Sequence, residues 1–127
     1  MTEFTSLLDW ESSVHKLRAA HLSVAPADAQ TWEHKITNAI KGLPYFERVK
    51  TAPLDDYSLF QRIQMRSAAG DAMTVRQDLR TVLNRYVFGN ERDEFVFVRR
   101  DGGFDIYIAI IDSDSLLFTS KLQVQIL

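Results

Sequence analysis

The sequence has 127 residues, enough for one domain with its own apolar core, and 46% of them are hydrophobic. Its formal net charge of −2 argues against a general nucleic-acid binder and a polybasic membrane anchor, and the lack of cysteine excludes thiol nucleophiles, disulfides and cysteine-bound metals. Neither a signal-peptide core nor an apolar run of membrane-spanning length occurs. We therefore expect a soluble, cytoplasmic protein that forms a single domain over residues 1–127.

Two amphipathic helices are predicted in the first third of the chain. Apolar residues recur at spacings of three and four within residues 2–22 and again within residues 26–43. Pro26 suits the first turn of the second helix. Gly42, in the left-handed conformation, should end that helix, and Pro44 prevents its continuation.

Two short strands are predicted next, over residues 45–51 and 57–66. Apolar and polar side chains alternate through most of the second segment, which is typical of a half-buried strand. Phe60 interrupts the alternation and also fits helical spacing, so a helix over residues 57–66 is the alternative.

A third helix is predicted to begin at Asp71 or Thr74 and to end at Phe88. Thr74 and Gln77 have the spacing of a capping box, in which each side chain satisfies a backbone N–H at the start of a helix. Gly89 should follow the helix as its left-handed terminating residue.

Residues 94–127 are predicted to form a meander of three antiparallel strands. Asp101 and Gly102 are a strong signal for a two-residue hairpin turn of type I′, which requires positive φ at both positions. This turn sets Phe97 opposite Ile106 and places the apolar side chains of both strands on one face.

A second turn connects the last two strands of the meander. A three-residue loop over residues 112–114 would set Ile110 against Leu116. A two-residue loop would instead set Ile106 against the cation Lys121. Because a slip by one residue turns every side chain to the other face, we predict the three-residue loop.

The predicted order α-α-β-β-α-β-β-β describes an α+β domain whose helices pack on one face of an antiparallel sheet. In this order the chain resembles the NTF2-like cone fold, which implies a small-molecule-binding or enzymatic domain with a pocket between helices and sheet. It also resembles phage tail-terminator and neck proteins, which combine helices with such meanders. That resemblance implies a structural subunit of a larger assembly.

No constellation of catalytic or metal-ligating residues emerges from the sequence. Glu11 and His15 have the helical spacing of a metal-binding pair, but no second pair accompanies them. The acidic turn at residues 112–115 lacks the glycine and the closing glutamate of a calcium loop. No glycine-rich phosphate loop or nucleophile elbow occurs. We therefore expect no catalytic residue, cofactor or metal, and a non-enzymatic protein.

Arginine is concentrated in residues 62–100, which contain eight arginines, no lysine and five acidic residues. Arg76 and Arg80 stand one helical turn apart, a repelling pair whose replacement by alanine should leave stability unchanged or slightly raised. Arginine is enriched at interfaces because its planar group forms bidentate contacts, although a solvated face with internal ion pairs is the alternative. The predicted docking residues, for an acidic protein surface or a phosphate backbone, are Arg62, Arg66, Arg76, Arg80, Arg99 and Arg100.

The final strand lacks the features that usually guard an exposed sheet edge. Residues 122–127 contain no proline, and Lys121 is the only charged residue beside them. Leu122, Val124 and Ile126 are therefore predicted to contact a second copy in a homo-oligomer, unless the strand lies inside its own sheet. The leading hypothesis is a non-enzymatic assembly or protein-binding module whose partner is protein, with neither nucleic acid nor membrane as its target.

Overall fold

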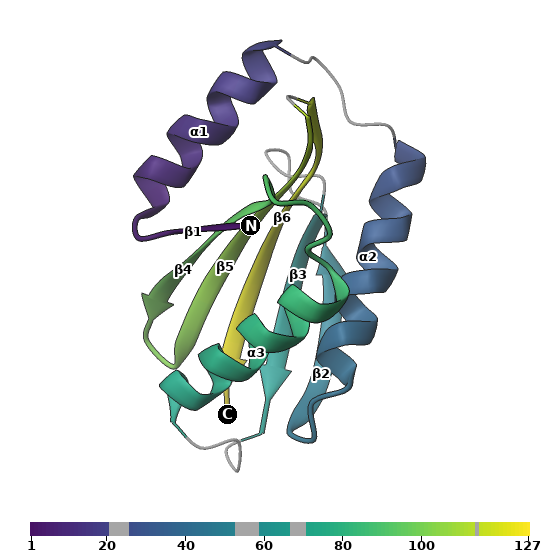
Figure 1. Ribbon diagram of the computed structural model, residues 1–127. Helices are drawn as coiled ribbons and strands as arrows, with labels where there is room; N and C mark the ends of the chain where they lie inside the picture. Colours follow the sequence, from purple (N-terminus) through teal and green to yellow (C-terminus); the bar gives the residue numbers. More distant parts are fainter. Residues whose placement is uncertain (21–25, 53–58, 67–70, 114) are drawn as a thin grey trace.

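The computed structural model describes residues 1–20, 26–52, 59–66, 71–113 and 115–127. The elements in this part of the chain are β1 (Thr2–Phe4), α1 (Leu7–Ala20), α2 (Pro26–Lys41), β2 (Phe46–Ala52), β3 (Leu59–Met65), α3 (Ala72–Tyr86), β4 (Glu94–Arg100), β5 (Gly103–Asp112) and β6 (Ser115–Ile126) (Figure 1). The α+β class is confirmed. The prediction that a helix begins at residue 2 is wrong, because a short strand comes first, and its predicted end at residue 22 lies outside the described residues.

All six strands form one mixed sheet in the order β1-β4-β5-β6-β3-β2. β1 pairs in parallel with β4 and β3 in parallel with β6, whereas the other three pairs are antiparallel. The prediction of an antiparallel sheet is therefore wrong. The reason is α3, which carries the chain from the end of β3 across the sheet to the start of β4, so that these two strands run in the same direction.

Helices cover both faces of this sheet, and the prediction that they share one face is also wrong. α2 and α3 pack on one face, whereas α1 packs on the other, where Trp10 and Val14 are buried against Tyr107 and Ile111. The cause is visible in β5, which is buried from Gly103 to Ile111. A strand covered on both sides carries a continuous apolar run in place of an alternating one.

The β4–β5 hairpin has the predicted register, with Phe97 opposite Ile106. Its turn is not of type I′, since Gly102 has a φ of +75° but Asp101 does not have a positive φ. Gly103 approaches β6 so closely that an added Cβ would lie 1.9 Å from the Val124 carbonyl oxygen. Glycine is therefore needed at position 103 because of strand proximity.

The register of β5 with β6 differs from the predicted one. Asp112 pairs with Ser115, so the predicted three-residue loop is wrong, and its third residue lies outside the described residues. One residue farther along the pair the register shifts at a bulge, after which Ile110 faces Phe118 and Ile106 faces Leu122. The bulge inserts one extra residue, and this keeps the apolar side chains of both strands on one face despite the shorter loop.

The helices differ from the sequence prediction in the glycines that follow them and in the N-cap of α3. α2 ends at Lys41, as the Gly42 signal predicts, but neither Gly42 nor Gly89 has a positive φ. The N-cap of α3 is Asp71, whose Oδ1 accepts from the Thr74 backbone N–H at 2.8 Å. Thr74 is therefore not the start of a capping box. Residues 59–65 form a strand, which excludes the helical alternative there, whereas residues 57 and 58 lie outside the described residues.

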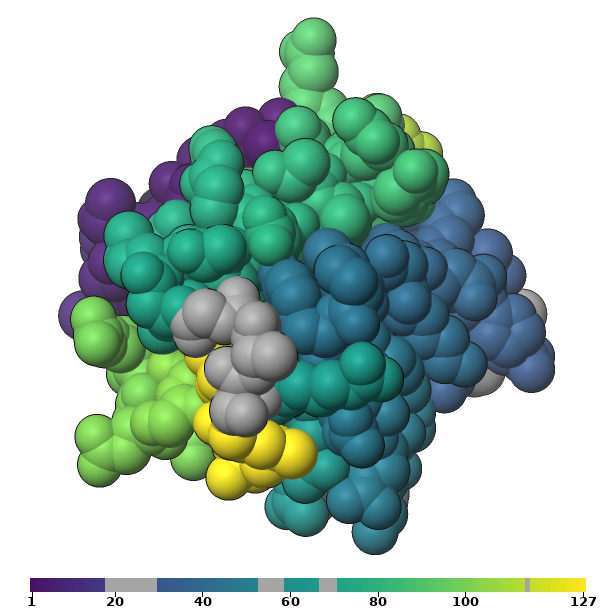
Figure 2. Space-filling view, turned by 90° about the horizontal axis from the view of Figure 1, so that it is seen from below, coloured from purple at the N-terminus to yellow at the C-terminus, as the bar shows by residue number. Residues whose placement is uncertain are grey.

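β6 is a central strand with hydrogen-bonded neighbours on both sides, β5 and β3. Leu122 and Val124 belong to the core beneath α2 and α3, and Ile126 packs partly against it. Seen from below, the last residues lie between the β4–β5 turn and the β2–β3 strands (Figure 2). The open edge on which the predicted self-association depends therefore does not exist, and no guarding residues are needed.

Candidate functional site

Among the described residues, α1 covers one end of the sheet face on which it packs. Strand alternation places a set of polar side chains from five strands on the remainder of this face. We call this set the open sheet face, and its members are Arg48, Lys50, Arg62, Gln64, Arg100, Asp105, Lys121, Gln123 and Gln125. Five of these residues are cations and one is a carboxylate.

The side chains of the open sheet face are arranged in rows that run across the strands. One row consists of Lys50, Arg62, Gln123, Asp105 and Val98. The next row consists of Arg48, Gln64, Gln125, Gly103 and Arg100. Directly opposite residues in a sheet have Cβ atoms about 4.5–5.5 Å apart, so neighbouring side chains in a row lie within reach of one another.

The single carboxylate of the face is buried and engaged from two sides. Arg100 Nη1 lies 3.0 and 3.1 Å from the two Asp105 carboxylate oxygens, and Lys121 Nζ lies 4.0 Å from one of them. Lys50 and Arg62 have no ion pair with any residue that the structure describes. The face therefore presents positive charge that the described part of the fold does not neutralise.

Two buried aromatic rings lie beside these cations. The Arg62 guanidinium carbon is 5.5 Å from the Phe60 ring centroid, and Lys121 Nζ is 5.8 Å from Phe60 and 5.3 Å from Tyr107. Both rings are less than a tenth exposed. Burial, followed by the nearby carboxylates of Asp105 and Glu11, raises the pKa of Tyr107, whereas Arg100 opposes this rise. The cations therefore lie over the ring faces in cation–π contact, and the buried rings offer little surface to an incoming ligand.

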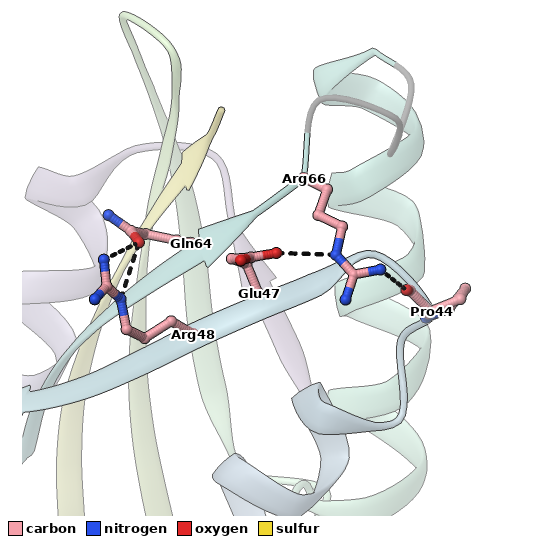
Figure 3. A network of polar contacts seen from close by, with 5 residues as sticks. All are labelled: Pro44, Glu47, Arg48, Gln64 and Arg66. Carbon is pink, nitrogen blue, oxygen red and sulfur yellow. Dashed lines mark hydrogen bonds and ion pairs between the residues drawn. The ribbon is translucent and has the colours of Figure 1, made fainter.

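A hollow of about 220 Å³ opens on this face, at the end away from α1. Its lining residues are Arg62, Ile63, Gln64, Arg100, Asp101, Gln123, Val124 and Gln125. The Gln123 amide lies against Arg100. With the amide oxygen turned toward the Arg100 guanidinium, this oxygen accepts from both Nη1 and Nη2. Gln64 Oε1 accepts from Arg48 Nε and Nη2 at 3.2 and 2.9 Å (Figure 3). Guanidinium and amide groups of this kind bind anions.

The structure brings together only some of the predicted docking residues. Arg62, Arg100 and Val124 line the hollow. Arg66, which follows β3, does not line the hollow. Its Nε lies 2.9 Å from Glu47 Oε2 and its Nη1 lies 3.5 Å from the Pro44 carbonyl oxygen (Figure 3). This is the internal ion pair that the sequence leaves open as the alternative.

Three further predicted arginines lie away from the open sheet face. Arg76 and Arg80 of α3 both form ion pairs with Glu3 of β1, and Arg80 Nε lies 3.0 Å from Glu3 Oε2. Arg76 also lies over the Phe97 ring, beside a second hollow of about 390 Å³. Arg99 alternates with Arg100 and therefore belongs to the sheet face that carries α3.

Sequence reasoning missed most members of the open sheet face. Arg48 and Lys50 alternate in β2, and the polar residues of β6 alternate with its buried ones, which is the signal that marks one strand face. A search for arginine-rich segments misses Arg48, Lys50 and the polar residues of β6, because they lie outside residues 62–100. Only the strand order, in which β6 lies between β3 and β5, places them together.

In the part of the chain that the structure describes, no helix has the length and apolarity needed to cross a membrane. The same residues contain no group of three or more histidine and acidic side chains that could hold a metal ion. No family model, curated protein or solved structure matches this chain.

Proposed function

We propose that this protein is a non-enzymatic protein-binding module that docks an acidic partner on its open sheet face. The observation that carries the proposal is the concentration of five cations and one buried carboxylate among the described residues of this face, in a chain of formal net charge −2. Complementary charge steers such a partner to the face and fixes its register. The partner can be a further subunit of a larger assembly, which is the role that the sequence predicts.

The arrangement of the cations favours binding over folding as their role. Lys50 and Arg62 stand directly opposite one another, and like charges at such positions destabilise a sheet. An internal salt-bridge network would instead alternate the two signs. The pair therefore supports a surface whose charge is completed by a partner.

Several features favour protein over nucleic acid as that partner. Single-stranded nucleic acids bind with their bases stacked on exposed aromatic rings. On the open sheet face the rings of Phe60 and Tyr107 are buried, and the exposed groups are guanidinium, ammonium and amide. These groups suit carboxylates, which accept two parallel hydrogen bonds from one arginine.

The pocket predicted from the element order is not supported by an observation on the described residues. The side chains between the sheet and the helices α2 and α3 form a buried cluster. The two hollows described above lie on the open sheet face and beside β1.

Fluorescence anisotropy with a labelled glutamate-rich peptide tests the proposed function. The variant carries Arg48→Gln, Lys50→Gln and Arg62→Gln, and the matched control removes the same charge from exposed positions elsewhere, Lys35→Gln, Lys41→Gln and Arg85→Gln. We expect the first variant to bind at least about tenfold more weakly than the wild-type protein, and the control to bind as the wild type does.

Two outcomes would count against this proposal. An equal loss of affinity in both triple variants would show that only the overall charge matters. Tighter binding of a DNA duplex than of the peptide, with a steep dependence on salt, would make phosphate the target.

A further inference from the structure

We infer that the hollow on the open sheet face holds one carboxylate side chain, from an aspartate or glutamate of the partner, as the anchor of the docked segment. This inference rests on the proposed function and names the chemistry at its centre. The hollow measures about 220 Å³, below the roughly 300–1,000 Å³ of pockets for small molecules. This volume suits a single side chain.

The guanidinium of Arg62 is the main free donor at the hollow. Arg62 is exposed, and the described residues offer it neither a hydrogen-bond acceptor nor an ion pair. Its contact with the Phe60 ring restricts the side chain without using its N–H groups. A planar guanidinium with free N–H groups matches a carboxylate in bidentate geometry.

Two of the three amides that line the hollow have their oxygens engaged within the protein. Gln64 Oε1 accepts from Arg48, and the Gln123 oxygen, oriented toward Arg100, accepts from that guanidinium. Each amide then has only its NH₂ group left for a ligand, and NH₂ donates. The hollow therefore offers donors from Arg62, Gln64 and Gln123, a set that an acceptor-only group such as a carboxylate satisfies.

The local charge selects a carboxylate over a phosphate. The charged residues that line the hollow are the cations Arg62 and Arg100 and the anion Asp101. Asp105, which does not line it, is held by both Arg100 and Lys121. One net positive charge remains at the hollow. A carboxylate carries one negative charge, whereas a phosphorylated side chain carries about −1.5 to −2 near neutral pH and would meet Asp101 and Asp105 as well.

The test is an NMR titration of the ¹⁵N-labelled protein with three blocked amino acids, N-acetyl-glutamate methylamide and its glutamine and phosphoserine counterparts. We expect the side-chain NH₂ signals of Gln64 and Gln123 to shift and saturate with the glutamate compound and to stay in place with the glutamine compound. Arg62→Gln should weaken this binding about tenfold or more. Arg66→Gln is the matched control, because it removes an exposed arginine that follows the same strand and does not line the hollow, and it should bind as the wild type does.

The outcomes separate this inference from the proposed function. If the glutamate-rich peptide binds but the blocked glutamate leaves both glutamine signals unmoved, the anchor is wrong and docking stands. If the blocked glutamate binds in the hollow but the peptide does not bind the face, the docking function is wrong and a small-anion site stands. Equal shifts with the glutamine compound, or tighter binding of the phosphoserine compound, would overturn the carboxylate assignment.

Discussion

Lys50 on β2 and Arg62 on β3 occupy directly opposite positions in an antiparallel pair, so that two cations face one another across the open sheet face. Neither of them has an ion pair with a described residue. Such a pair costs about 0.2–1 kcal/mol of folding stability. Stability and binding should therefore respond in opposite directions when one of the two charges is changed.

Lys50→Glu should stabilise the fold and weaken the docking of acidic peptides. The change removes the repulsion and sets a carboxylate opposite Arg62, so the free energy of unfolding in urea should rise by roughly 0.5–1 kcal/mol. Lys50→Gln removes the repulsion without adding an attraction. Its free energy of unfolding should therefore lie between those of the wild-type protein and Lys50→Glu. A decrease in stability for both variants would show that the charges do not repel in the folded protein.

Replacing Arg76 and Arg80 together with alanine should destabilise the protein, in contrast to the expectation from sequence. Glu3 lies between the two guanidinium groups and compensates their repulsion. Since all three side chains are partly exposed, the expected loss is about 1 kcal/mol, together with faster hydrogen exchange at the β1 amides. Glu3→Gln should reproduce most of the loss, and a stability equal to that of the wild-type protein in both variants would contradict the role of this cluster.

Asp93→Ala should be among the most destabilising single changes in this fold. The buried carboxylate accepts from the backbone N–H groups of Gly89, Asn90 and Ile111, each at 3.0 Å, and thereby joins the end of α3 to β5. Its removal leaves these donors without their partner, at a cost of about 3 kcal/mol or more in the free energy of unfolding. Asp112→Ala, at the exposed end of β5, should change the free energy of unfolding by less than about 0.5 kcal/mol. Equal effects of the two substitutions would refute this assignment.

Tyr45→Phe should change the way in which the stability of the protein depends on pH in the alkaline range. Tyr45 donates to Asp78 Oδ2 at 2.6 Å, and burial together with this carboxylate raises the pKa of the phenol above its usual value. Because the folded state holds the proton more tightly than the unfolded state, the contribution is present below about pH 10 and is lost as the pH rises through the folded pKa.

The Tyr45→Phe variant should therefore be less stable near neutral pH, by about 1 kcal/mol, and its stability should fall less steeply above about pH 10. Some slope should remain, since the pKa of Tyr107 is raised as well. The exposed Tyr86→Phe provides the control and should leave the pH profile unchanged. A Tyr45→Phe profile parallel to that of the wild-type protein would contradict the linkage.

Local features of the fold are predictable from the sequence where two independent signals agree. At the β4–β5 hairpin the Asp101-Gly102 turn and the apolar alternation give one register, and Phe97 lies opposite Ile106 as predicted. In the β5–β6 pair, alternation places the right side chains on each face. The shorter loop and the bulge there together move the partners by two positions from the predicted register, and a bulge leaves no signature in an apolar run.

Features that depend on distant pairing are not predictable in this way. β1 is three residues long and is defined by its partner β4, more than 90 residues away in sequence. The open sheet face is likewise formed by strands that are distant in sequence and pair in the sheet. Arg62 and Arg100 stand out by arginine density, whereas Lys50 and Gln123 become their neighbours only through the strand order.

The central place of β6 has a consequence for the order of events during translation. The β2–β3 pair and the β1–β4–β5 strands have no hydrogen-bonded contact in the sheet except through β6, whose residues are synthesised after those of the other five strands. A nascent chain that stops before Ser115 leaves β3 and β5 each with an unpaired edge beside large apolar side chains, a state prone to aggregation. Synthesis of this last strand, and not the earlier formation of the helices, thus sets the moment at which the sheet can close.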